Sequence, residues 1–138
     1  MTGRTASVVV CDNILSDITA KIYLYGLYPV DISIPGNELL VNQLAFYFSI
    51  FTPNERPFKH VILRVTPPES ATTEMNYPLA GVHDAVKNPN RPKMIFRAPL
   101  LLQQILLKVG KIETKVILDN DEELDAGGIW VSSVGTQA

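Results

Sequence analysis

The sequence contains a single cysteine, no long hydrophobic run and no excess of basic residues, and each absence excludes a class of protein. The lone Cys11 cannot form an intrachain disulfide, which is typical of proteins in a reducing compartment. No apolar stretch approaches the roughly 18 residues of a membrane-spanning helix, and the opening MTGRTASVVVCDN is interrupted too early for a signal peptide. Twelve basic and 14 acidic residues give a net charge of -2, without the basic surface of a nucleic-acid-binding protein. We therefore expect a cytoplasmic protein that binds neither nucleic acid nor membrane.

Catalytic motifs are missing as well. The sequence has no Gly-x-Ser-x-Gly elbow, no glycine-rich phosphate loop, and neither the His-x-x-x-His nor the Cys-x-x-Cys spacing of zinc sites. Asp12 follows Cys11, and an acidic neighbour disfavours the thiolate, so we expect Cys11 to be a core residue. The sequence therefore predicts no enzyme and no cofactor.

The remaining polar candidates have ordinary structural interpretations. We expect His60 and His83 to be solvated. The acidic run at 119–125, DNDEELD, lacks the central glycine and distant glutamate of a calcium loop, so we expect a charged hairpin turn and no metal site. The competing hypothesis is an enzyme whose site is assembled from dispersed residues, namely His60, His83, Asp84 and this acidic turn.

The sequence is rich in short runs of Val, Ile, Tyr and Phe, which Pro, Gly, Asn and Asp interrupt about every ten residues. This pattern predicts an all-β fold, an antiparallel β-sandwich of immunoglobulin-like layout, and the length of 138 residues suits one domain spanning 1–138. Strands are expected at 7–12, 21–28, 31–35, 41–51, 58–66, 75–79, 93–97, 111–118 and 128–134. The first two should pair as an opening hairpin, and Pro35 should either place the third at a sheet edge or end it.

Two segments are ambiguous. Residues 67–92 hold five of the ten prolines, which predicts a long surface excursion. In 98–109, apolar residues recur with a helical period, with Pro99 suited to a first turn and Gly110 to a C-terminal stop. Periodicity alone therefore favours one short helix there.

Both ends of the chain resemble a known family. The stretches VVVCDN, AKIYLYGLY and LKVGKIETKVILDNDEELDAGGIWV are similar to those of small bacterial and phage-associated β-sandwich proteins of unknown function, while the middle is unmatched. Leu107, Gly110 and the hairpin at Asp119 to Glu122 carry the likeness. The resemblance implies that residues 100–107 form a strand, against the helical period. The sequence departs from such sandwiches at Ile112, where they often have tyrosine, so a tyrosine corner is absent or lies elsewhere. The resemblance brings no activity.

Two predicted strands are apolar on both faces, which an ordinary half-buried strand is not. The aromatic residues concerned are Tyr23 and Tyr25 in KIYLYGLY and Tyr47 and Phe51 in 41–51. Either the second face is covered by the excursion at 67–92, or it is an exposed patch for self-association or a partner. We predict a non-catalytic binding or structural module, most simply a homodimer. The alternative is a carrier of a small apolar ligand with a pocket between the sheets.

Overall fold

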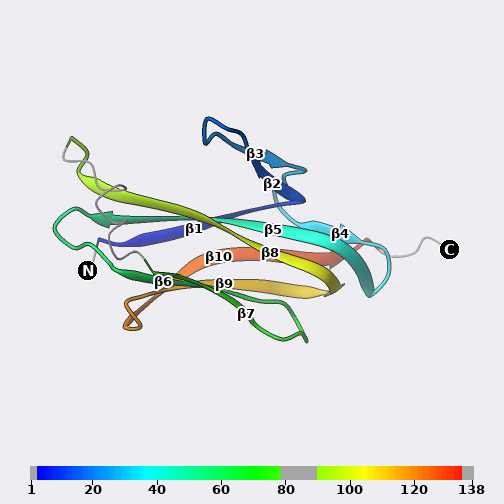
Figure 1. Ribbon diagram of the computed structural model, residues 1–138. Coiled ribbons are helices and arrows are strands. Elements are labelled where there is room, and N and C mark those ends of the chain that lie inside the picture. The colour runs from blue at the N-terminus through cyan, green and yellow to red at the C-terminus, as the bar shows by residue number, and fades with distance from the viewer. Residues whose placement is uncertain (1–2, 79–89, 135–138) are drawn as a thin grey trace.

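Two β-sheets pack face to face in the computed structural model, which describes residues 3–78 and 90–134 (Figure 1). A two-stranded hairpin projects from the upper sheet in this view. None of the residues in these two ranges is helical, so no helix there is long and apolar enough to cross a membrane. The prediction of an all-β sandwich is confirmed.

The upper sheet has the order β1-β5-β8, with β1 at Thr5–Cys11, β5 at Glu38–Pro53 and β8 at Lys93–Lys108. Both pairings are antiparallel, and β5 is the central strand, paired along one side with β1 and along the other with β8. Thr5 lies opposite Phe51 at one end of β1.

The lower sheet has the order β4-β10-β9-β6-β7. Its strands are β4 at Ile32–Ile34, β6 at His60–Thr66, β7 at Thr73–Pro78, β9 at Gly110–Leu118 and β10 at Glu122–Ser133. The short β4 lies at the edge, as the sequence predicted, and is parallel to β10, whereas the other pairs are antiparallel.

The turn between β9 and β10 confirms the predicted acidic hairpin. Asp119 and Asn120 have φ values of 55° and 57°, and the amide of Asp121 donates to the carbonyl of Leu118 at 3.0 Å. Asn and Asp tolerate positive φ, and two central residues of this kind match the right-handed twist of the flanking strands.

Alternating apolar side chains from both sheets fill the core. In β6, which lies within the strand expected at 58–66, Val61, Leu63 and Val65 are fully buried while the residues between them are half-buried. Phe58 and Phe96 meet edge to face, with centroids 6.2 Å apart. The largest fully buried side chains are Phe46, Phe48, Phe58, Ile34, Leu44, Ile50, Leu63, Met94, Leu100, Leu107, Ile112 and Leu118.

The helical period at 98–109 does not produce a helix, because these residues belong to β8 and its connection to β9. Buried residues alternate up to Leu102 and resume at Ile105, three positions later. Gln104 lies between them with a φ of 52°, a left-handed conformation that rotates the strand and changes which face points inward. The i, i+3 spacing that favoured a helix is therefore a twist in a strand, and the strand implied by the resemblance is confirmed.

One end of the sandwich is closed by a buried arginine. Arg4 Nε donates to Thr52 Oγ1 at 2.9 Å, and Nη1 donates to Glu122 Oε1 at 2.8 Å. Nη2 donates to the carbonyls of Arg56 at 2.8 Å and Pro57 at 3.3 Å. The side chain is only 8% exposed, and it joins β1, β5, β10 and the loop after β5.

One pairing expectation was wrong. The residues of β1 pair with β5, not with 21–28, and the hairpin is formed instead by β2 at Asn13–Ser16 and β3 at Ile22–Tyr25. The strand expected at 75–79, within the excursion at 67–92, is confirmed by β7, which pairs with β6. Residues 79–89 of the excursion lie outside the described part of the chain.

Candidate functional site

The β2–β3 hairpin rises from the outer face of the upper sheet, where β1 ends (Figure 1). Its base is fixed by polar contacts: the amide of Asp12 donates to the carbonyl of Tyr25 at 2.8 Å, and Gln43 Nε2 donates to Asn13 Oδ1 at 2.8 Å. The Tyr28 hydroxyl donates to Asp12 Oδ1 at 2.7 Å, and burial, followed by Asp12, raises the pKa of Tyr28 to about 12. The hairpin is therefore anchored firmly to the sheet.

The hairpin base also explains the burial of Cys11. Cys11 lies opposite Ala45 on the outer face of the sheet, yet both residues are 0% exposed, since the chain turns into the hairpin there. Burial raises the pKa of the Cys11 thiol, and Sγ lies 3.4 Å from the carbonyl oxygen of Asn13. The prediction that Cys11 is a core residue is confirmed.

The tip of the hairpin is organised around Asp17. Its Oδ1 accepts hydrogen bonds from the Thr19 hydroxyl at 2.6 Å, the Thr19 amide at 2.8 Å and the Lys21 amide at 3.1 Å, and its Oδ2 accepts one from the Tyr23 hydroxyl at 2.7 Å. These donors, the Thr19 hydroxyl first, lower the pKa of Asp17 to about 2. Between Asp17 and Thr19, Ile18 is 104% exposed. A well-ordered turn thus presents an aliphatic side chain entirely to solvent.

Apolar side chains are exposed on both faces of the hairpin. Leu15 pairs with Tyr23 on one face, where they are 49% and 41% exposed, and Tyr25, at 50%, shares that face. Ile22, on the other face, is 42% exposed. The doubly apolar strand noticed in the sequence is therefore real, and these side chains remain substantially exposed.

The second half of the predicted patch lies on the upper sheet itself. Tyr47 and Phe51 point outward from β5, because the alternate residues Phe46, Phe48 and Ile50 are buried inside the sandwich. Both are half-buried. The outer face also carries Val9, Ile95, Pro99 and Leu101. The structure therefore places the four predicted interface candidates on one side of the molecule, with Tyr23 and Tyr25 on the hairpin and Tyr47 and Phe51 on the sheet.

Three exposed members of this surface were missed in the sequence. Leu15 lies between the strands predicted at 7–12 and 21–28. Ile18 lies within the turn around Asp17, and Ile22 follows that turn. The only available signal was Asp17 followed by Thr19, since an Asp side chain that binds the backbone two residues on is typical of a tight turn.

Among the polar candidates, the described ones are His60 and the acidic turn, and they meet through backbone contacts. His60 is half-buried, with Nδ1 shielded from solvent, so the expectation of a solvated side chain is wrong for this residue. His83 and Asp84 lie outside the described residues. Asp119 Oδ1 accepts the amides of Lys59 at 2.8 Å and His60 at 3.0 Å, so it caps the start of β6. Within 3–78 and 90–134, no group of three or more His, Cys, Asp or Glu side chains could hold a metal ion.

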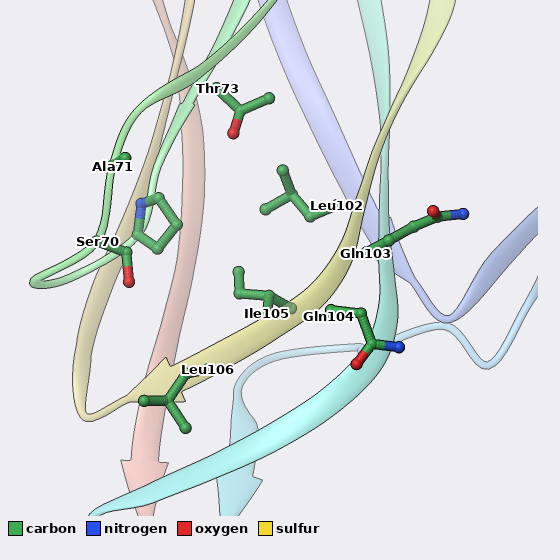
Figure 2. Close-up of a pocket in the computed structure, with 9 residues that line it drawn as sticks. Ser70, Ala71, Thr73, Leu102, Gln103, Gln104, Ile105 and Leu106 are labelled. Carbon is green, nitrogen blue, oxygen red and sulfur yellow. The ribbon is translucent and has the colours of Figure 1, made fainter.

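The surface hollows are small. One of about 210 Å³ lies between β8 and the loop that follows β6 (Figure 2). Leu102 and Ile105 point into it toward that loop, while Gln103 and Gln104 point away. A second, of about 240 Å³, lies beside β1 and the loop after β3. Both are below the roughly 300–1,000 Å³ of sites that enclose a small molecule.

No protein-family model matches this sequence, and no curated protein matches it either.

Proposed function

We propose that the protein is a non-catalytic binding module that associates with a second copy of itself through the β2–β3 hairpin and the outer face of the β1-β5-β8 sheet. The observation that carries this proposal is the exposure of apolar side chains on both faces of the hairpin. A partner surface that covers these side chains would remove their apolar area from water and so stabilise the complex.

The residue types suit a protein interface. Tyr23 and Tyr25 offer large rings with a polar tip, which is why tyrosine is enriched where proteins meet. Burying a whole aliphatic side chain contributes about 1.5–3 kcal/mol, so the half-exposed Leu15 would add about 1 kcal/mol and the fully exposed Ile18 the whole amount.

The test is the mass in solution, measured by light scattering on a sizing column at several concentrations. The wild-type protein should be a dimer, and the double substitution Tyr25→Lys with Tyr47→Lys should give a folded monomer. Trp130 is a matched control, because it is 56% exposed on the outer face of the other sheet. Trp130→Lys should leave the dimer intact. A wild-type monomer at every concentration would exclude self-association.

We extend the proposal to the setting of the protein. Cytoplasmic location is supported by the single cysteine, which is a buried free thiol. An immunoglobulin-like layout and kinship with small bacterial and phage-associated β-sandwich proteins are supported by the two packed sheets and by the motifs at both ends of the chain. Fractionation of cells that produce the protein tests the location, because recovery in a membrane or secreted fraction would contradict it.

A further inference from the structure

Two features of the outer face are complementary to each other. The first, which we call the hook, is the side chain of Ile18 at the hairpin tip. The second, which we call the socket, is a hollow of about 200 Å³ lined by Phe51, Arg91, Pro92, Lys93 and Ile95. An exposed aliphatic side chain and an apolar hollow of matching size are the elements of a buried anchor at a protein interface.

The hook is held in place before any contact is made. Four hydrogen bonds to the Asp17 carboxylate fix the turn, and the amide of Ala20 donates to the Asp17 carbonyl at 3.0 Å. Contacts at the hairpin base fix the other end. A rigid element loses little conformational entropy on binding, so most of the gain from burying Ile18 would appear as affinity.

The socket is built on paired strands. Phe51 of β5 lies opposite Ile95 of β8, and both point outward from the sheet. The Arg97 guanidinium lies 5.7 Å from the centroid of the Phe51 ring, and its Nε donates to Ser49 Oγ at 3.1 Å. The apolar floor of the socket is therefore bordered by positive charge.

The charges around the two features are opposite. The hairpin and its base, residues 12–28, carry two aspartates, at 12 and 17, and one lysine, at 21, a net charge of -1, with Asp17 directly beside the hook. The socket side, 91–97, carries Arg91, Lys93 and Arg97, a net charge of +3. Opposite charge beside matching apolar surfaces favours a second copy of this chain as the occupant, since every copy carries both.

The placement of the two features suits a symmetric dimer. The hairpin follows Cys11 at one end of β1, and the socket residue Phe51 lies opposite Thr5 at the other end. The hairpin rises from the outer face of the upper sheet (Figure 1), and Phe51 and Ile95 of the socket point outward from the same sheet. A two-fold axis parallel to this face and between them would bring each hook to the socket of the other copy, which makes a closed interface.

We propose that Ile18 of each copy inserts into the Phe51–Ile95 socket of the other, so that two reciprocal contacts hold the dimer together. This inference rests on the proposed function, because it specifies how the same surface associates. It requires both a hook and a socket, which makes it separable from self-association in general.

The test uses two variants that are each defective in a different half. Ile18→Asp removes the hook and Ile95→Asp damages the socket, and each variant alone should dimerise at least about 100-fold more weakly, since two buried side chains are lost per dimer. An equimolar mixture should form a heterodimer, because the intact hook of one variant meets the intact socket of the other. Met75→Asp, at an exposed position on β7 of the other sheet, is the control and should dimerise as the wild type does.

A cross-link provides a second measurement that does not depend on the folding of charged variants. In the double variant Ile18→Cys and Ile95→Cys, mild oxidation should link two chains covalently, and Cys11 should not compete because it is 0% exposed. Three results would overturn the hook-and-socket contact while leaving self-association intact. They are dimers of normal affinity from either Asp variant alone, a mixture of folded Asp variants that stays monomeric, and a dimeric Ile18→Cys, Ile95→Cys double variant that gives no 18-to-95 cross-link. A wild-type monomer would overturn both.

Discussion

The buried ion pair between Arg4 and Glu122 should contribute far more to stability than a shorter ion pair on the surface. The Arg4 side chain is 8% exposed and Glu122 is 20% exposed, with 2.8 Å between Nη1 and Oε1. The substitution Glu122→Gln keeps the shape of the side chain but removes its charge, so Arg4 loses this carboxylate in a poorly solvated position. Removing one partner of a buried pair costs about 3–5 kcal/mol, and the partial exposure of Glu122 reduces the expected loss to about 2–3 kcal/mol.

The chain supplies a matched control in Arg64 and Glu74, which lie 2.6 Å apart but are 36% and 38% exposed. Exposed pairs contribute about 0–1 kcal/mol, so Glu74→Gln should lose less than about 1 kcal/mol despite the shorter distance. Urea unfolding followed by circular dichroism measures both free energies of unfolding. Equal losses for the two variants would refute the reasoning, because burial, not distance, is expected to decide the outcome.

Three further predictions concern the backbone and the hairpin tip. The Thr19 hydroxyl and other donors lower the pKa of Asp17 to about 2, so the stability that their hydrogen bonds contribute should be complete above the ordinary value of 3.8 and disappear as the pH falls through about 2. The NMR chemical shift of the Thr19 amide should titrate with a midpoint near 2, and a midpoint near 3.8 would contradict the prediction. Gly128 has a φ of 132°, and in Gly128→Ala the new Cβ would lie 2.2 Å from a carbonyl oxygen of β9, so thermal unfolding should show a loss of at least about 2 kcal/mol in the free energy of unfolding. Gly127→Ala, where φ is also positive but the space is open, should lose less. Gln104→Gly should raise the free energy of unfolding by about 0.5 kcal/mol, because glycine adopts a φ of 52° without the steric cost; a clear loss would show that the Gln104 side chain stabilises β8.

Strands and their buried faces were largely predictable, because alternation of apolar side chains follows directly from the geometry of a half-buried strand. The buried residues of β6 illustrate this, since every second position of Val61 to Val65 faces the core. The period fails where the backbone leaves extended geometry, and the left-handed Gln104 is such a place. No composition signal marks that position, so a twisted strand and a helix have the same apolar spacing there.

Strand pairing was less predictable, because alternation says which face is apolar and not which strand lies alongside. Nothing local in β1 indicates that Val9 lies opposite Tyr47 of β5. The four aromatic candidates could be chosen from sequence, since each lies on the second apolar face of a strand. Ile18 could not be chosen from sequence, because a single isoleucine is usually part of a core. Only the hydrogen bonds of the Asp17 side chain, seen in the structure, explain why Ile18 points outward.

The parallel pair of β4 and β10 sets the order in which the chain can fold during synthesis. Ile32 pairs with Val131, so β4 waits for a partner that leaves the ribosome only after a further two thirds of the chain. Thr5 pairs with Phe51, so β1 waits a shorter time for β5. The β2–β3 hairpin, by contrast, has both of its strands within 13–25 and can form at once. Pairings between distant segments slow folding, and incomplete sheets expose strand edges. The β2–β3 hairpin thus forms first and the complete sandwich last. The need for a chaperone is greatest after the hairpin has formed and before β10 has paired with β4.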